Sequence, residues 1–192
     1  MSPLPALPPD FQTALASLRG ARCRGELNLA EVPAPARLAP FGVAMGAEIM
    51  VDGEQLATGR FILLHDPDGS ALWGGTFRIV TYIRSELEPD MGNDPLLGNV
   101  AWAWLVEALE AQGAGFSNAG GTATRILSES YGALAARPDA IDLELRASWT
   151  PAGTSVRSHL EAWANIMCTF AGLPPLPDGV TLLDPRRNRT DR

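Results

Sequence analysis

The sequence predicts an α+β protein in which an antiparallel sheet of about five strands carries its helices on one face. Runs of alternating apolar and polar residues are separated by short turn signals, which is typical of strands joined as hairpins. Apolar stripes at helical spacing fall between groups of strands, which favours an antiparallel layer fold over parallel βαβ units. The predicted order is helix, three strands, helix, two strands and helix.

The first helix is predicted over residues 10–20, where apolar residues recur at helical spacing and Asp10 can cap the N-terminus. A short strand over 26–32 can precede the main sheet. The connection over 33–40 is rich in proline, which neither a helix nor a central strand tolerates, so we expect it to be irregular.

The next three strands form a predicted meander. Apolar residues alternate over 41–51, and Asp52-Gly53 is a strong two-residue hairpin signal. The second strand covers 55–65, and Asp66-Pro-Asp-Gly69 is typical of a turn. The third strand covers about 72–84. Consecutive hairpins of this kind pair their strands in sequence order.

The second half of the chain is predicted to contain a helix, two strands and a final helix. A helix is predicted from Asn93-Asp94-Pro95 to about residue 112, because a capping side chain precedes a proline in the first turn. Residues 113–121 are rich in glycine and are predicted to form a loop, and 122–129 reads as a strand.

The last strand and the last helix have clear patterns. Residues 141–149 alternate, and we expect Asp142, Glu144 and Arg146 to face water. The final helix is predicted from residue 154 or 155 to 171, where Gly172 and two prolines end it.

Composition limits the classes of function. The chain has 192 residues with 46% hydrophobic and 19% charged, which is typical of a globular protein. Its net charge of −7 disfavours a nucleic-acid partner. No apolar run approaches the roughly 20 residues that cross a bilayer, and the N-terminus lacks the pattern of a signal peptide, so a cytoplasmic protein is expected. We expect a flexible lead over 1–9, a single α+β domain over 10–176, and a loosely held basic tail over 177–192.

Three arginines of the meander, Arg60, Arg78 and Arg84, are candidate binding residues. If Arg60 and Arg78 face the same side of neighbouring strands, they could hold an anion or a partner's carboxylate. They could equally pair with Glu86 or Glu48 on a solvated face, and this second arrangement is the expected one.

Two other side chains of the meander are candidates. His65 stands at a strand end beside Asp66, so it could be a general base oriented by a carboxylate, or simply a half-exposed histidine at the edge of a turn. Trp73 lies near a predicted hairpin turn, where an exposed indole would suit a contact with a partner, although packing on the sheet is the simpler expectation.

No metal or cofactor is predicted. The acidic run of Glu86, Glu88, Asp90 and Asp94 lacks the ordered spacing of a calcium loop. The glycine-rich segment follows a helix instead of preceding one, which disfavours a phosphate loop. The two cysteines show no zinc spacing, and the expected state is a pair of free thiols.

Several segments resemble an actinobacterial family of unknown function, among them Gly-Thr-Phe-Arg-Ile-Val-Thr-Tyr at 75–82 and Arg-Ala-Ser-Trp-Thr-Pro at 146–151. The other matching segments are 35–40, 57–60, 63–67, 86–91, 94–97 and 128–130. The resemblance implies a cytoplasmic actinobacterial protein and brings no activity or site residues. The element order is also similar to that of type III secretion chaperones, which are small acidic α+β domains that often form homodimers and bind polypeptide segments.

Two hypotheses of function follow. The first is a non-enzymatic interaction or regulatory module that binds a protein partner and forms a homodimer. The alternative is an enzyme or small-ligand binder with a pocket between sheet and helices near Arg60, His65, Arg78 and Glu86. The alternative requires these four side chains to converge on one cleft.

Overall fold

A computed structural model of the chain describes residues 6–87 and 92–175. The described part contains a six-stranded sheet in the order β1-β2-β3-β4-β6-β5, and all neighbouring strands are antiparallel. The strands are β1 (Leu27–Val32), β2 (Phe41–Val51), β3 (Glu54–Ser70), β4 (Gly75–Leu87), β5 (Phe116–Ser128) and β6 (Ala140–Pro151). The predicted α+β class is confirmed. The sheet has one strand more than expected, because the optional segment pairs with β2 along its whole length.

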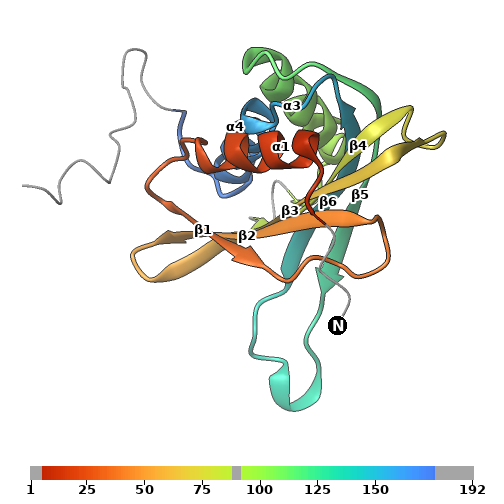
Figure 1. The fold of residues 1–192 in the computed structure, drawn as a ribbon. Helices are drawn as coiled ribbons and strands as arrows, with labels where there is room; N and C mark the ends of the chain where they lie inside the picture. Colours follow the sequence, from red (N-terminus) through yellow and green to blue (C-terminus); the bar gives the residue numbers. More distant parts are fainter. Residues whose placement is uncertain (1–5, 88–91, 176–192) are drawn as a thin grey trace, which may run out of the picture.

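The helices α1 (Pro9–Arg19), α3 (Leu97–Ala111) and α4 (Arg157–Phe170) cover one face of the sheet, as predicted (Figure 1). The core lies between these two layers, where Phe61, Trp149 and Trp163 are fully enclosed. The opposite face of the sheet carries no α-helix within the described residues, and we call it the open face (Figure 1).

The meander differs from the prediction at its second turn. Strand β3 continues through residues 66–69, which were predicted to be the turn, and the chain reverses over 71–74. The local turn chemistry is present, since the Asp68 N–H donates to the Asp66 carboxylate at 3.1 Å and Gly69 has a positive φ of 77°. These features produce an irregularity in the pairing of β3 with β4 instead of a reversal.

Strand β5 corrects a second expectation. The segment over 113–121 is not a loop throughout, because β5 begins at Phe116 and pairs with β6. A break in register between Ser117 and Gly120 accommodates the irregular stretch. Position 121 of the strand requires glycine, because a Cβ there would lie 2.8 Å from the Trp102 ring of α3. Glycine here permits close packing of a helix on a strand.

Helix starts also differ from their predicted positions. Asp10 lies inside the first turn of α1, whose cap is Pro8, so its charge favours the helix N-terminus without capping it. Helix α3 begins at Leu97, and Asp94 organises the turn before it by accepting a hydrogen bond from the Leu96 N–H at 2.8 Å. The last helix is confirmed to within three residues at its start. The predicted tail over 177–192 and residues 1–5 of the predicted lead lie outside the described residues.

The open face is bordered by two segments. The connection between β1 and β2 packs Ala34 and Ala39 on a small apolar patch of Ala44, Ile62 and Leu64. The hairpin over 129–139, which includes the short 3-10 helix η1 (Gly132–Leu134), descends from β5 and β6 on the helix-free side (Figure 1). The sheet between them is therefore the floor of a concave surface.

Candidate functional site

Strand register places polar side chains in rows across the open face. One row is Ala30, Gly46, Arg60, Tyr82, Arg146 and Thr122, from β1 to β5. The adjacent row is Val32, Ala44, Ile62, Val80, Ser148 and Gly120. The second row is small or apolar except for Ser148, while the first row carries the large side chains of Arg60, Tyr82 and Arg146.

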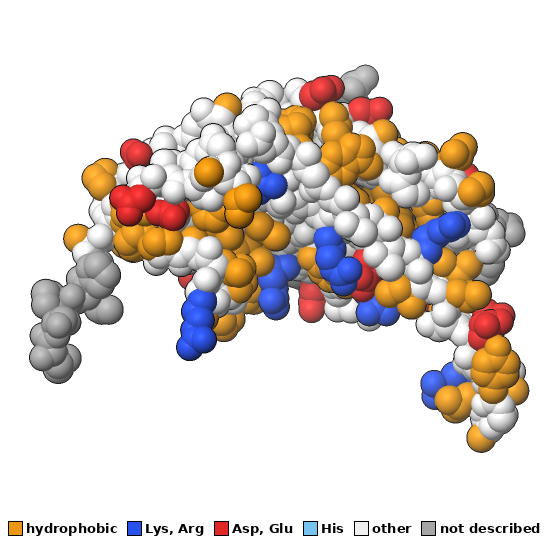
Figure 2. All heavy atoms as spheres, turned by 90° about the vertical axis from the view of Figure 1, so that its right-hand side faces the viewer, with side chains coloured by type: hydrophobic (Ala, Val, Ile, Leu, Met, Phe, Trp, Pro, Cys, Tyr) orange, Lys and Arg blue, Asp and Glu red, His pale blue; other side chains and the backbone are white. Residues whose placement is uncertain are grey.

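The two rows line a depression that we call the central trough. It consists of two hollows of about 440 Å³ and 290 Å³, and both are lined by Arg60. The first lies over β1, β2 and β3, and the second continues over β4, β6 and β5. Figure 2 shows the underside of the molecule hollowed, with arginine side chains projecting from it.

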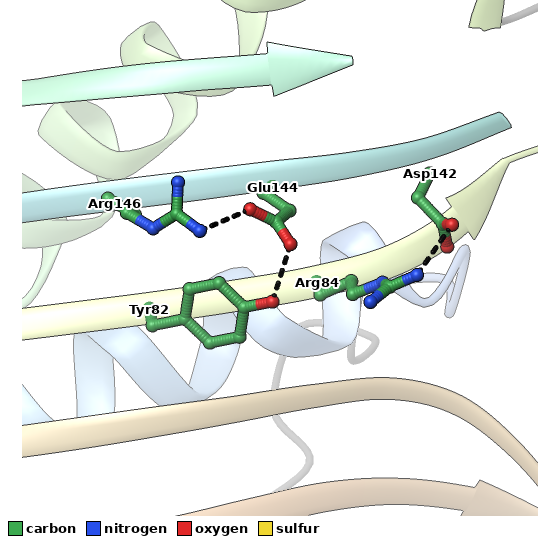
Figure 3. Close-up of polar contacts among 5 residues, drawn as sticks. All are labelled: Tyr82, Arg84, Asp142, Glu144 and Arg146. Atoms are coloured by element: carbon green, nitrogen blue, oxygen red, sulfur yellow. Dashed lines mark hydrogen bonds and ion pairs between the residues drawn. The ribbon is translucent and has the colours of Figure 1, made fainter. Parts of the chain in front are cut away.

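A compact polar network occupies the wall of the trough (Figure 3). Glu144 is buried, and its carboxylate accepts hydrogen bonds from the Tyr82 hydroxyl at 2.8 Å and from Arg146 at 2.6 Å. The Arg146 guanidinium also lies 5.5 Å from the centre of the Tyr82 ring. Burial, followed by the hydrogen bond to Glu144, raises the pKa of Tyr82. The expectation that Glu144 faces water is therefore wrong, because Tyr82 and Arg146 cover it.

Arg84 forms a separate ion pair on the same face. Its guanidinium donates to Asp142 at 2.8 Å, and this hydrogen bond raises the Arg84 pKa (Figure 3). The Arg84 side chain is 46% exposed, so solvent screens the pair and its contribution to stability is small. At this end of the open face, the charge of Arg84 is therefore already neutralised by Asp142.

Arg78 is half-buried and bonds only to neutral acceptors. It donates to the Asn118 carbonyl at 2.8 Å, to Thr150 Oγ1 at 3.1 Å and to Ser148 Oγ at 2.7 Å. Burial lowers its pKa, yet a guanidinium remains charged in proteins. The positive charge of Arg78 therefore has no carboxylate partner among the described residues.

Arg60 is exposed at the centre of the trough, and within the described ranges it makes no ion pair or side-chain hydrogen bond. It does share a face with Arg78, as one of the two predicted arrangements requires. The expected pairing with Glu48 or Glu86 is wrong, because neither arginine bonds to a carboxylate of the described chain. Two unpaired positive charges therefore mark this region of a chain whose net charge is −7.

His65 lies on the other side of the sheet and is only 2% exposed. Its ring stacks on Phe77 at 4.2 Å and on Phe11 at 5.7 Å, and its Nδ1 lies 3.0 Å from the Thr76 carbonyl oxygen. The expected half-exposed position is wrong, since the ring fills the core beneath α1. Asp66 does not orient the ring, because its carboxylate accepts from a backbone N–H.

Trp73 and Glu86 occupy the two ends of the meander. Trp73 is half-buried and packs against the apolar patch that includes Ile62, in agreement with simple packing on the sheet. Its carbonyl accepts hydrogen bonds from Asn118 at 2.8 Å and from Thr150 at 2.5 Å. Glu86 is exposed and lies opposite Asp142. The structure thus brings Arg60 and Arg78 to one face but does not make His65 and Glu86 converge with them.

Sequence reasoning missed Tyr82, Glu144 and Arg146 as a group. Tyr82 and Glu144 are 62 positions apart, and only the pairing of β4 with β6 brings them together. The available signal was the i, i+2 repeat of polar residues on two strands, with Tyr82 and Arg84 on one and Glu144 and Arg146 on the other.

The thiols and acids of the described residues provide no further reactive group. Burial raises the pKa of Cys23 to about 11 and also raises that of Cys168, so both thiols are protonated at neutral pH. No cluster of three or more His, Cys, Asp or Glu side chains that could hold a metal ion occurs in residues 6–87 and 92–175. In the same ranges, no helix has the length and apolar character needed to cross a membrane.

Comparison with known proteins relates the chain to a family of unknown function. The family model described as "Protein of unknown function (DUF3000)" matches residues 7–181, which is most of the chain. Searches of curated proteins and of solved structures return no match. The relationship therefore carries no assigned activity or site residues.

Proposed function

The chain belongs to the DUF3000 family of proteins of unknown function, and we propose that it is a non-enzymatic module that binds an acidic segment of a partner protein in its central trough. We further propose that it acts as a homodimer, as the sequence leads us to expect.

The observation that carries the proposal is that neither Arg60 nor Arg78 forms an ion pair within the described residues. Glu48 lines the same hollow as Arg60 but makes no ion pair with it. Arg78 is partly desolvated, and a desolvated charge gains from an opposite charge more than a fully hydrated one does. Elsewhere on the same face, Arg84 and Arg146 already have acidic partners. A carboxylate from a partner protein would give Arg60 and Arg78 the kind of acidic partner that the other two arginines already have.

The shape of the trough favours a polypeptide over a small ion. Its rows cross six strands, and five spacings of about 4.8 Å make a length of about 24 Å. An extended chain rises about 3.4 Å per residue, so about seven residues fit along it. The floor of alanine, glycine and valine residues would contact apolar side chains, while the arginines would receive acidic ones.

The chemistry of the trough favours binding over catalysis. The Glu144 carboxylate is already engaged by hydrogen bonds from Tyr82 and Arg146, so its oxygens are not free to act on a substrate. His65 lies on the opposite face of the sheet. The enzyme alternative therefore loses the convergence of side chains on which it depended.

A synthetic peptide tests the proposal. The probe is a fluorescein-labelled 12-residue peptide of alternating Glu and Val, and the control peptide has Gln for every Glu. We expect fluorescence anisotropy at low salt to show binding of the acidic peptide alone. R60Q and R78Q should each weaken binding roughly tenfold, which is the effect of losing one charge-assisted hydrogen bond.

R19Q is the matched control variant, because Arg19 is an exposed arginine in the last turn of α1 on the helical side of the molecule. It removes the same charge and should leave the affinity unchanged. An equal loss of peptide affinity in R19Q and R60Q would show that general electrostatic attraction, and not the trough, holds the peptide. Failure of the acidic peptide to bind, or wild-type affinity in R60Q and R78Q, would overturn the proposal.

A further inference from the structure

Strand β5 forms one edge of the sheet, and its outer side meets no other strand among the described residues (Figure 1). The regular part of the edge is residues 120–128, because the register breaks before Gly120. Protein edges are commonly protected by proline, lysine or short length. This stretch contains no proline and a single charge, Arg125, whose guanidinium donates to the carbonyls of Gly92 at 3.3 Å and Asp94 at 3.0 Å.

The surface beside this edge carries apolar side chains that are exposed or half-buried. Leu127 is 59% exposed at the edge itself. Helix α3 packs on β5 through Gly98 and Trp102, and only Glu107 and Glu110 are charged among its 15 residues. Trp102 remains only half-buried. A helix that is apolar around most of its circumference is typically buried, so both the strand and the helix indicate that this side of the molecule is covered.

We propose that a second copy of this chain covers the edge, with the two β5 strands paired antiparallel about a two-fold axis. This inference rests on the homodimer named under the proposed function and assigns its interface. The two sheets would continue as one across the axis. A two-fold axis perpendicular to the sheet keeps the open faces of both copies, and hence both troughs, on the same side.

The sequence of the edge is suited to pairing with itself. Residues 120–128 have their midpoint at Thr124, so pairing of the full stretch places Thr124 opposite Thr124 of the second copy. Arg125 then lies opposite Ala123 of the second copy, so the one charge of the strand does not meet itself. Leu127 lies opposite Gly121 of the second copy, beside the Trp102 ring that packs over that glycine. Each exposed apolar group thus meets a small or apolar one.

Oligomeric state and a position-specific cross-link test this interface. Sedimentation velocity should show a dimer for the wild-type chain. T124K places two positive charges opposite each other at the axis and should raise the dimer dissociation constant roughly fivefold, the effect of a like-charge cross-strand pair. T124C in a C23S background should form a disulfide-linked dimer under mild oxidation, because directly opposed residues have Cβ atoms close together.

T58C is the matched control, since Thr58 lies on the same face in the middle of the sheet, where β3 is paired on both sides. It should stay uncross-linked. An unchanged dimer dissociation constant in T124K, with no cross-link in T124C, would overturn the interface and leave the homodimer standing. A wild-type monomer would overturn both. Peptide binding in the trough is measured separately, so its failure would not be confused with either result.

Discussion

Protonation of His159 should destabilise the fold between pH 6.5 and pH 4. The ring is 2% exposed on α4, and its Nδ1 accepts a hydrogen bond from Trp149 Nε1–H at 3.1 Å. A protonated imidazole has no acceptor nitrogen, so the charged form would lose this bond as well as its hydration. Burial accordingly lowers the His159 pKa from 6.5 to about 4.

The magnitude follows from linkage. The unfolded chain takes up the proton near pH 6.5 and the folded chain only near pH 4, so the contribution to stability is complete above pH 6.5, declines as the pH falls, and is gone below pH 4. At 1.36 kcal/mol per pKa unit, the whole effect is about 3 kcal/mol. About 2 kcal/mol of it is lost between pH 7.5 and pH 5.

Urea unfolding of the wild type and of H159Q across this range measures the effect. The glutamine oxygen can still accept from Trp149, while the variant lacks the titrating group. Glu26, whose pKa is lowered first by its hydrogen bond with Arg24, affects stability only below its ordinary value of 4.5. Because H159Q retains His65, the difference between the two proteins from pH 6.5 to pH 5 reports His159. An equal fall in the free energy of unfolding of both proteins over that interval would show that His159 is not the responsible group.

Three further predictions concern packing, the trough wall and the thiols. G59A should destabilise the fold by about 1–3 kcal/mol in urea unfolding, because a Cβ at Gly59 would lie 2.6 Å from Met167 and Trp163 and 2.9 Å from a backbone oxygen; a neutral effect would contradict the close crossing of α4 over β3. Y82F and E144Q should show a coupling free energy of about 0.5–3 kcal/mol in a double-mutant cycle, since their side chains bond at 2.8 Å, and additive effects would contradict that bond. Cys23, which is half-buried and has its pKa raised from 9.0 to about 11, should hold roughly a hundredfold less thiolate at pH 8 than a free cysteine and react correspondingly slowly with iodoacetamide. Alkylation at the rate of free cysteine would contradict the raised pKa.

The elements that could be predicted are those with local signals. Asp52 and Gly53 both have positive φ, 51° and 84°, as the two-residue hairpin turn requires, and this turn fixes the pairing of β2 with β3. The start of β5 could not be predicted in this way. Glycine usually marks a loop, and the reason for Gly121 in a strand is the Trp102 ring of a helix that lies earlier in the chain.

The candidate site was predictable in part. Alternation in β3 places His65 with the core residues Phe61 and Leu63, so its separation from Arg60 could have been read from the odd and even positions alone. The partners of Arg78 could not, because Ser148 and Thr150 lie at least 70 positions away on a strand that is not the next in sequence. The register between strands that are distant in the sequence decides which charges are neutralised, and this register cannot be predicted from a local sequence pattern.

The most direct test of the proposed function is whether an acidic peptide contacts Arg60 in the trough and Arg78, which borders the trough through its hydrogen bond to Ser148. Arginine Nε–H resonances of ¹⁵N-labelled protein, assigned with R60Q, R78Q and R19Q, can be followed while the Glu-Val peptide is added. The proposed function predicts that the resonances of Arg60 and Arg78 shift with a common saturation curve, while that of Arg19 stays in place. Shifts confined to arginines of the helical side, or no shift at Arg60 and Arg78 when the peptide is bound, would contradict it.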